Sequence, residues 1–438
     1  MLTEFRPTAV LTDAEIELIL GSVLQDDGAW SNSTATTEAR SAPSGTVACV
    51  IVGGVATAVV LLVVSSSPYP SDFLTYRYGA LLAAHGTDLY DGNVTGQFLP
   101  GQPFTYPPVA SIFLWPTTLG PWRASYVGWC VVSCAVLAAL FAKGVPAHLG
   151  RRPVIVLAAM AGAASTGLLS ANVAMGQVNL LLMGLCLADL YRRDDTALGR
   201  LVPPGVLVGI ATAIKLTPTL FVVYFVVTRQ RRLAWWSVVA AVSMTALGAV
   251  LRPEMSVSFF GSAIWNLTDR VDLGHPLGYP GNASISGVLH ALGGPAATLA
   301  TPLAVLSALL ALAAARRAHR QRRELDAWLI VGLTAPLVSP FSWNHHYVYV
   351  LPALLTIVLT RPWARRPWGV ALIALSLCTL LFPAAAGARL LQDGRWWTAI
   401  PGVAVRENVL LVAIGCIVAL TLSSRSTDRI SPPAWARV

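Results

Sequence analysis

Two adjacent histidines, His345 and His346, are the residues whose type and setting most strongly suggest chemistry. They lie in the segment SPFSWNHHYVYVLP at 339–352, between two strongly apolar runs. Polar side chains in such a position are costly in hydrocarbon unless they face water, a partner or a ligand. An imidazole can also gain a proton near neutral pH, which suits binding a phosphate or moving a proton. Trp343 and Asn344, which precede the pair, are further candidates for substrate contacts.

The histidine pair also has an interpretation without chemistry, as interfacial residues among the Trp and Tyr anchors of a membrane belt. Adjacent residues on a helix point about 100° apart, so only one imidazole is expected to face a cavity. No Cys, Asp or Glu at ligand spacing accompanies the pair. We therefore predict no metal site at this position.

A carboxylate, Asp72, is the second candidate, and it opens a segment with helical spacing, Asp72–His85. Tyr76 and Arg77 follow it within this segment. Aromatic rings and a guanidinium beside a carboxylate resemble a sugar- or phosphate-binding surface. The alternative is a solvated loop carboxylate that caps the helix.

Three further polar side chains interrupt apolar runs. Lys215 lies within ATAIKLTPTLFVVYFV, and a lysine at that depth is functional by default unless it snorkels to an interface. Gln177 and Asn179 lie in MGQVN at the end of an apolar run. They can hydrogen-bond a ligand, or they can simply join neighbouring helices. The sequence contains no nucleotide-binding loop of the Walker or Rossmann kind.

The composition is that of a polytopic membrane protein. Of 438 residues, 55% are hydrophobic and only 12% are charged, whereas a soluble domain carries about 25% charged residues. The net charge of +9 comes from arginines clustered in short segments between apolar runs. That is the pattern of cytoplasmic loops, so nucleic acid is not an expected partner. The six cysteines lie within predicted spans and show no disulfide framework.

The arginine clusters also predict how the chain crosses the membrane. We expect a retained first helix at 47–64 and two outer loops, at 65–123 and 252–294. The run at 205–227 lies between two basic clusters, and it is too short to cross twice, since one crossing takes about 20 residues. We therefore predict a break at Lys215–Pro218 that divides it into two short helices lining a cavity. The total is about twelve transmembrane helices with both termini in the cytoplasm.

This topology divides the chain into three parts. Residues 1–46 are predicted to be a disordered cytoplasmic tail, residues 47–423 a transmembrane domain, and residues 424–438 a second cytoplasmic tail. The Asp72 loop, the loop at 252–294 and the histidine turn all emerge on the outer face. The predicted site is therefore extracytoplasmic.

Four motifs, in this order along the chain, resemble glycosyltransferase family 87. They are FTYPP at 104–108, MGQVNLLL at 175–182, GIATAIKLTP at 209–218 and SPFSWNHHYVYVLP at 339–352. The similarity extends over residues 47–422. Within the family, the motifs are most similar to the actinobacterial polyprenol-phosphate-mannose-dependent α-1,2-mannosyltransferases. The segment NASISG at 282–287 is a looser match, and it adds Asn282 to the candidate residues, as FTYPP adds Tyr106.

The resemblance implies a fold of the GT-C type, with juxtamembrane helices in the first outer loop. It further implies a plasma-membrane enzyme that takes mannose from polyprenyl-phosphate-mannose. The acceptor would be a mannoside on a cell-envelope glycolipid or lipoglycan, and the product an α-1,2 linkage formed by inverting displacement. By position, the acid that acts as base in this family corresponds to Asp72.

The chemistry of the candidate residues is compatible with this reaction. A carboxylate within hydrogen-bond reach can accept the proton of an attacking hydroxyl. The phosphate leaving group needs cationic or hydrogen-bonding support, for which Lys215, Arg77 and one histidine are candidates. The scheme requires no metal and no cofactor. The expected partners are the lipid-linked donor, the mannosylated acceptor and membrane lipids.

Two other functions remain open from the sequence. One is transfer of arabinofuranose or another pentose on the same fold, although the paired histidines favour mannose because the arabinosyl relatives lack them. The other is movement of a lipid-linked sugar between leaflets without forming a glycosidic bond. The identity of the acceptor is also open, because it depends on loops whose contacts the sequence does not place.

Overall fold

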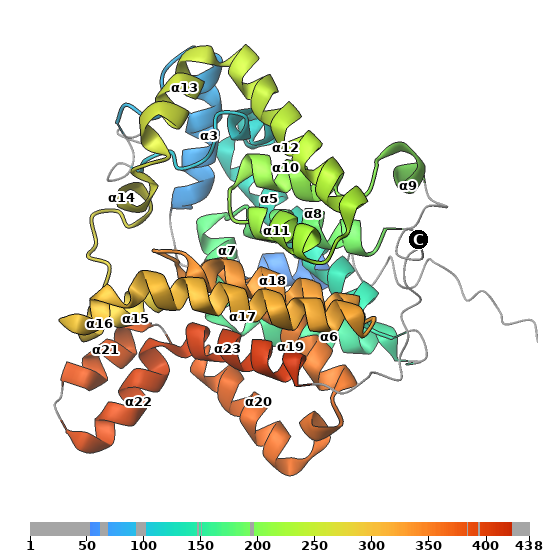
Figure 1. Ribbon diagram of the computed structural model, residues 1–438, viewed down its shortest axis with the longest axis vertical. Coiled ribbons are helices and arrows are strands. Elements are labelled where there is room, and N and C mark those ends of the chain that lie inside the picture. Colours follow the sequence, from blue (N-terminus) through green and yellow to red (C-terminus); the bar gives the residue numbers. More distant parts are fainter. Residues whose placement is uncertain are drawn as a thin grey trace, which may run out of the picture. The chain divides into compact units, whose positions relative to one another are not determined.

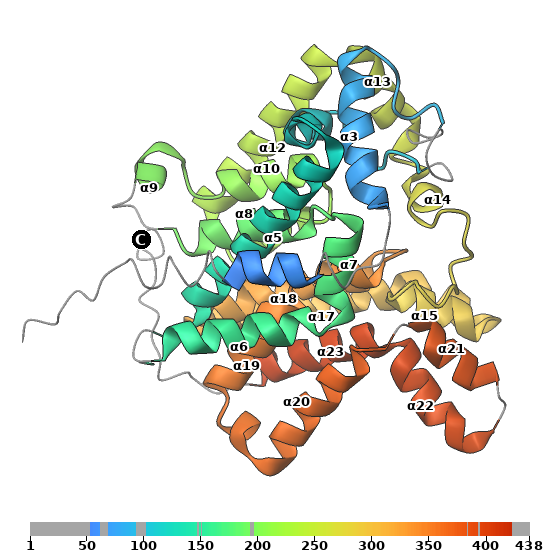
Figure 2. The same cartoon turned by 180° about the vertical axis from the view of Figure 1, so that it is seen from behind.

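The computed structural model describes residues 53–61, 69–92, 102–146, 149, 151–192, 197–382, 384–392 and 395–422. Every regular element with assigned bounds in these residues is a helix, so the prediction of an all-α chain is confirmed for this part. The predicted tails at 1–46 and 424–438, and most of the predicted first helix at 47–64, lie outside the described residues. Figure 1 and Figure 2 show the arrangement of the helices from two sides.

The helices that carry the candidate residues come first. They are α3 (Ser71–Ala84), α4 (Ala110–Phe113), η1 (Trp115–Thr118), α7 (Gly167–Met175), α8 (Asn179–Leu190), α10 (Val206–Ile214), α11 (Thr219–Val227), α18 (Glu324–Val338), η3 (Asn344–His346) and α19 (Val350–Thr360).

The remaining helices frame these elements. They are α5 (Trp122–Gly144), α6 (Arg152–Ala164), α9 (Ala197–Leu201), α12 (Arg231–Leu251), α13 (Pro253–Ser258), η2 (Phe259–Ala263), α14 (Leu267–Val271), α15 (Ile285–Leu292), α16 (Pro295–Thr298), α17 (Ala300–Arg320), η4 (Pro362–Arg365), α20 (Pro367–Thr379), α21 (Ala384–Gln392), α22 (Trp396–Arg406) and α23 (Asn408–Thr421). Residues 53–61 are also helical.

The predicted break in the run at 205–227 is confirmed. α10 ends at Ile214, and Lys215 follows it in an extended conformation with φ −147° and ψ 135°. Pro218 then caps the start of α11. Proline fixes its own φ near −65° and lacks a backbone N–H, so it suits the first turn of a new helix and not the interior of an old one. The sequence KLTP therefore places a polar turn in the middle of an apolar run.

Hydropathy predicts two spans in the apolar run at 154–190, at 154–170 and 173–190, but the structure divides this run into three helices, α6, α7 and α8. α6 and α7 meet at a bend of 75° near Ser165 and Thr166. The side chain of Thr166 caps α7 by accepting a hydrogen bond from the backbone N–H of Leu169. A second boundary follows at Gly176, before α8 begins. The prediction missed the bend because a threonine cap within an Ala- and Gly-rich run does not change its hydropathy.

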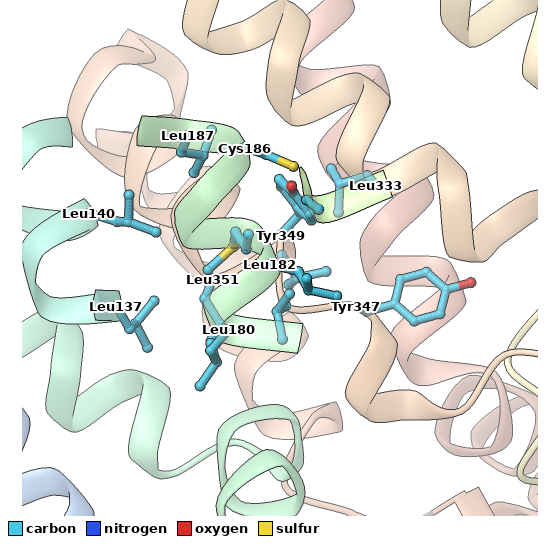
Figure 3. Packing of buried hydrophobic residues seen from close by; sticks show 14 of the residues in the cluster. Leu137, Leu140, Leu180, Leu182, Cys186, Leu187, Leu333, Tyr347, Tyr349 and Leu351 are labelled. Atoms are coloured by element: carbon cyan, nitrogen blue, oxygen red, sulfur yellow. The ribbon is translucent and has the colours of Figure 1, made fainter. Parts of the chain in front are cut away.

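The core lies where α5, α8 and α19 pack together (Figure 3). Figure 3 shows Leu137 and Leu140 from α5 on the same side of α8 as Leu180 and Leu187, whereas Leu182 and Cys186 lie on its other side, toward Tyr349; all of these residues are buried. Burial of such side chains contributes about 1.5–3 kcal/mol each relative to exposure. This packing fixes the start of α8, which carries Asn179, against the turn that carries the histidines.

Three helices among the described residues are long and apolar enough to cross a membrane, namely α5, α12 and α17. The bent pairs α6–α7 and α22–α23 raise the number to five if each pair counts as one span. α3, with 14 residues, is shorter than such a span. The chain is therefore a helical membrane protein.

Candidate active site

α3 positions the predicted base. Asp72 lies in its first turn, half-buried, and the Ser71 hydroxyl donates to its Oδ2 at 3.2 Å. One turn later on the same face, the buried hydroxyl of Tyr76 lies 2.8 Å from the hydroxyl of Tyr106, which belongs to FTYPP. The first outer loop therefore brings its carboxylate and two phenols to one place.

A glycine allows α7 to approach α3 closely. Gly176 ends α7 with φ +69°, in the left-handed region that only glycine adopts without cost. A Cβ atom at this position would lie 2.5 Å from the Cβ of Phe73 on α3. The glycine of MGQVN thus reverses the chain within van der Waals contact of α3, and the next residue, Gln177, enters the site.

Gln177 joins three of the predicted candidates. Its Oε1 accepts hydrogen bonds from the Tyr76 hydroxyl at 3.1 Å and from Asn179 at 3.3 Å. Its Nε2 lies 3.0 Å from Nε2 of His345. Because the amide nitrogen is the donor, Nε2 of His345 is the acceptor and its ring proton belongs on Nδ1. The same amide acts on the carboxylate of Asp72 by lowering its pKa.

Lys215 reaches the same cluster from the break between α10 and α11. Its Nζ donates to Asn179 Oδ1 at 2.9 Å and lies 5.4 Å from the centre of the Tyr106 ring. Its charge also acts on the carboxylate of Asp72. The lysine predicted from its depth in the run is therefore directed at the site and does not snorkel away from it.

The two histidines take different places. His345 is buried, and its backbone oxygen accepts hydrogen bonds from Asn172 and Asn179, each at 3.0 Å. His346 is half-buried, and its Nδ1 accepts from the backbone N–H of Trp343 at 3.3 Å. The rings are nearly perpendicular, with centroids 4.8 Å apart. His346 lines a cavity whose lining does not include His345.

That cavity, of about 40 Å³, has both polar and apolar residues in its lining. Lys215, Asn179 and His346 are among the polar ones, and Leu182 and Phe221 are among the apolar ones.

Two predicted substrate contacts instead hold the histidine turn in position. The Asn282 amide donates to the backbone oxygens of Leu277 and Pro340, at 2.8 and 3.1 Å, while its oxygen accepts from Ser342 N at 3.0 Å. Trp343 donates from Nε1 to Val271 O at 3.0 Å and stacks parallel to His345. The loop at 252–294 is thus joined to the histidine turn by hydrogen bonds between a side chain of one segment and the backbone of the other.

Arg77 and Asn344 are placed away from this network. Arg77 donates from its two terminal nitrogens to the backbone oxygens of Thr117 and Gly120, at 2.6 and 2.9 Å, and so joins α3 to η1. Asn344 begins η3 and is half-buried, and its backbone oxygen accepts a hydrogen bond from the Tyr347 N–H at 3.1 Å. The structure therefore brings Asp72, Tyr76, Tyr106, Gln177, Asn179, Lys215, His345 and His346 together, and leaves these two outside.

Asn172 is a member of the network that sequence reasoning missed. It lies on α7 and is buried, and its amide donates to the backbone oxygens of Leu168 and His345. The signal was present, since a buried asparagine within an apolar run must find a partner. Asn172 lies before the MGQVNLLL motif, in an apolar run whose hydropathy does not single it out.

Burial is the largest influence on the carboxylate of Asp72. It raises the pKa of this group from the ordinary value of 3.8 to about 6, although Ser71, the charge of Lys215 and the amide of Gln177 each act to lower it. A carboxylate with such a pKa is ionised at pH 7 and accepts a proton more readily than an exposed one. The site can therefore hold a general base that operates near neutral pH.

His345, in the turn between α18 and α19, is affected in the opposite sense. Burial, and then the charge of Lys215, lower the pKa of its imidazole to about 3. This ring is neutral at pH 7, so it can donate or accept a hydrogen bond but does not supply a positive charge. The cationic member of the described cluster is Lys215.

The fold and this site define a helical membrane protein with a half-buried carboxylate, a lysine and a cavity of mixed polar and apolar lining. Comparison with known proteins gives the particular family. The family model of glycosyltransferase family 87 matches residues 104–340, more than half of the chain. The chain belongs to glycosyltransferase family 87.

Curated relatives agree with this assignment. The polyprenol-phosphate-mannose-dependent alpha-(1-2)-phosphatidylinositol mannoside mannosyltransferase of Mycobacterium tuberculosis is 31% identical over 391 residues, which cover 83% of this chain and 88% of that protein. A polyprenol-phosphate-mannose-dependent alpha-(1-2)-phosphatidylinositol pentamannoside mannosyltransferase, also from Mycobacterium tuberculosis, is 29% identical over 68% of this chain and 69% of its own.

Among solved structures, the crystal structure of ArnT from Cupriavidus metallidurans bound to undecaprenyl phosphate aligns with a TM-score of 0.40 and 18% identity. The alignment covers 87% of this chain and 76% of that one.

Proposed function

We propose that this chain transfers mannose from polyprenyl-phosphate-mannose to a mannoside on a cell-envelope glycolipid or lipoglycan and forms an α-1,2 linkage. The observation that carries the proposal is the convergence of Asp72, Lys215 and the histidine turn on Gln177 and Asn179, in a chain of glycosyltransferase family 87. The names of the curated relatives support the donor and the linkage.

In the proposed reaction, Asp72 accepts the proton of the acceptor hydroxyl as its oxygen attacks the anomeric carbon. The bond from that carbon to the phosphate oxygen breaks at the opposite side, so a β-linked donor gives an α-linked product. The carboxylate pKa of about 6 supports this role, because general bases act best when their pKa lies near the working pH.

The leaving polyprenyl phosphate keeps its own negative charge and needs a cation more than an acid. Lys215 is the group we assign to it, because this ammonium lines the cavity beside Asn179 and His346. The half-buried imidazole of His346 is placed to offer a hydrogen bond to the same phosphate. The scheme uses no cofactor.

The same proposal includes a GT-C architecture of about twelve transmembrane helices, with the site on the extracytoplasmic face of the plasma membrane and both termini inside. It retains a transmembrane domain at 47–423 between two cytoplasmic tails. The positions of the arginine clusters support this sidedness.

The test is transfer by the purified full chain, reconstituted with a phosphatidylinositol mannoside acceptor. Polyprenyl-phosphate-mannose and its arabinose counterpart are supplied in parallel, and the linkage of the product is determined. We expect an α-1,2-mannosyl product and none from the arabinose donor. A pentosyl product, or no glycosidic bond together with movement of donor between leaflets, would overturn the proposal.

Asp72→Asn provides the control within the site. We expect transfer to fall by at least about a hundredfold, which is the usual contribution of general base catalysis. Asp88→Asn is the matched control, since Asp88 lies after α3 in the same loop and its carboxylate accepts from Tyr90 N and from Ser258 outside the network. Full activity of Asp72→Asn would remove Asp72 from the mechanism.

A further inference from the structure

A second cavity, of about 860 Å³, lies at the other end of α11 from Lys215. It is lined by the turn between α11 and α12, by the end of α17 and by Arg322, which follows α17. Its arginines are Arg229, Arg231, Arg232, Arg316, Arg320 and Arg322. The lining that the structure describes contains no Asp or Glu.

The acidic groups nearest along the chain are already paired. Glu324 accepts at 2.8 Å from Nδ1 of His319, which itself lines the cavity, and Asp326 accepts from Arg323 and Arg361 at 2.7 and 2.6 Å. Neither carboxylate is part of the lining. The six lining arginines therefore outnumber these two carboxylates.

Helix dipoles do not account for this concentration of arginines. Cations are favoured at helix C-termini, which suits Arg320 at the end of α17, but they are disfavoured at helix N-termini. Arg231 and Arg232 are nevertheless the first two residues of the 21-residue helix α12. An N-terminus with unpaired backbone N–H groups favours an anion, and two arginines there strengthen that preference.

The backbone also departs from its usual preference at this cavity. Arg229 and Arg322 have φ of 61° and 62°, in the left-handed region where helix C-termini normally place glycine. One follows the end of α11 and the other follows the end of α17. An unfavourable conformation at two arginines of one cavity is the kind of strain that accompanies a functional site.

The cavity lies at the membrane surface opposite the loop at 252–294. The first residues of α12 line the cavity, and α12 ends before that loop; α17 begins after α15, and its last residues line the cavity. Figure 1 shows the course of both helices. Each has 21 residues, or about 31 Å at 1.5 Å per residue, which matches the thickness of a bilayer core. The loop at 252–294 contacts the histidine turn of the candidate active site through the Trp343–Val271 hydrogen bond. The arginine-rich cavity is at the opposite ends of α12 and α17, so it is separate from the candidate active site.

We infer that this cavity binds a phosphate-bearing anion of at least two negative charges. Arginine presents paired N–H donors that match phosphate oxygens, and several arginines from separate segments can share one phosphate group. The phosphate could come from the headgroup of an anionic lipid in that leaflet or from a soluble diphosphate. The inference does not depend on the proposed transfer reaction.

The test measures binding to the purified full chain in neutral detergent, by native mass spectrometry, with two probes. Phosphatidic acid represents the lipid source, and inorganic pyrophosphate represents the soluble source. The test variant is Arg229→Gly with Arg316→Gln, in which glycine suits the left-handed backbone at 229 and so protects the fold. The control variant, Arg365→Gln with Arg366→Gln, removes the same charge from exposed arginines in and after η4.

We expect saturable one-to-one binding that the test variant weakens by at least about tenfold, because lost charge-assisted hydrogen bonds each contribute about that factor. The control variant should change it less than about twofold. Binding of only one probe supports the inference and identifies the source of the phosphate. Equal weakening in both variants, loss only in Lys215→Met, or no saturable binding of either probe would overturn it.

Discussion

At the scale of single residues, Asp72 determines the pH dependence that the mechanism requires. The base must be ionised before it accepts a proton, and burial places its pKa at about 6. We therefore expect kcat/KM for mannosyl transfer to fall about tenfold per pH unit below pH 6. A single acidic limb is expected, because His345 stays neutral with a pKa of about 3. A profile flat down to pH 4 would contradict this role of Asp72.

Replacing Lys215 changes the pH profile as well as the rate, and the pH profile distinguishes loss of its charge from loss of its packing. Its charge lowers the pKa of Asp72, so Lys215→Met should move the acidic limb to higher pH. It should also reduce kcat/KM by at least about tenfold, through loss of the leaving-group contact. Lys143→Met is the matched control, since Lys143 is exposed in the last turn of α5. A lower rate without a shifted limb would leave Lys215 with a structural role alone.

The same carboxylate makes a prediction about stability. A carboxyl group whose pKa is raised from 3.8 to about 6 stabilises the fold below pH 4 and loses that contribution as the pH rises through 6. Asp72→Asn should therefore be at least as stable as the parent at pH 7, by as much as about 1–2 kcal/mol after allowing for partial exposure. Thermal unfolding at pH 7 and pH 4 measures it, and the difference should vanish at pH 4.

At the scale of elements, the approach of α7 to α3 depends on Gly176. Gly176→Ala places a methyl group against Phe73 in a left-handed backbone, and we expect a loss of about 1–3 kcal/mol in stability. Transfer should fall as well, because Gln177 would move relative to Asp72. Gly162→Ala, on α6, is the control, since a Cβ atom at that position would have no neighbouring atom within 4 Å. Equal unfolding temperatures for the two variants would show that α7 tolerates the change.

Elements differed in how far the sequence could predict them. The break between α10 and α11 was predictable because a lysine and a proline interrupt a run too short to cross twice. The bend between α6 and α7 was not, because its cap, Thr166, acts through one backbone hydrogen bond. α21 and α22, which pack together, were also missed, because Arg389 and Arg395 interrupt the apolar pattern of that region. Hydropathy detects long spans better than local caps.

For the candidate site, the sequence predicted which residues take part better than it predicted what their side chains contact. Residue type and depth selected Lys215, Gln177 and the histidines, and the structure brings these together with Asp72. Side-chain direction was beyond the sequence, because it depends on packing between distant segments. Arg77 therefore looked like a phosphate contact from its neighbours in sequence, yet its donors bond to backbone oxygens of η1 and Gly120.

At the scale of the whole molecule, the proposed sidedness rests on two 21-residue helices, α12 and α17, that connect the arginine-rich cavity with the loop at 252–294. Cysteine accessibility tests it directly. Asn266→Cys places a thiol on the exposed part of the loop, and Arg365→Cys places one on the exposed η4 turn. In intact cells, a membrane-impermeant maleimide should label the first variant above the parent background and label the second only after permeabilisation. The reverse pattern would move the site to the cytoplasmic face, where an extracytoplasmic lipid-linked donor could not reach Asp72.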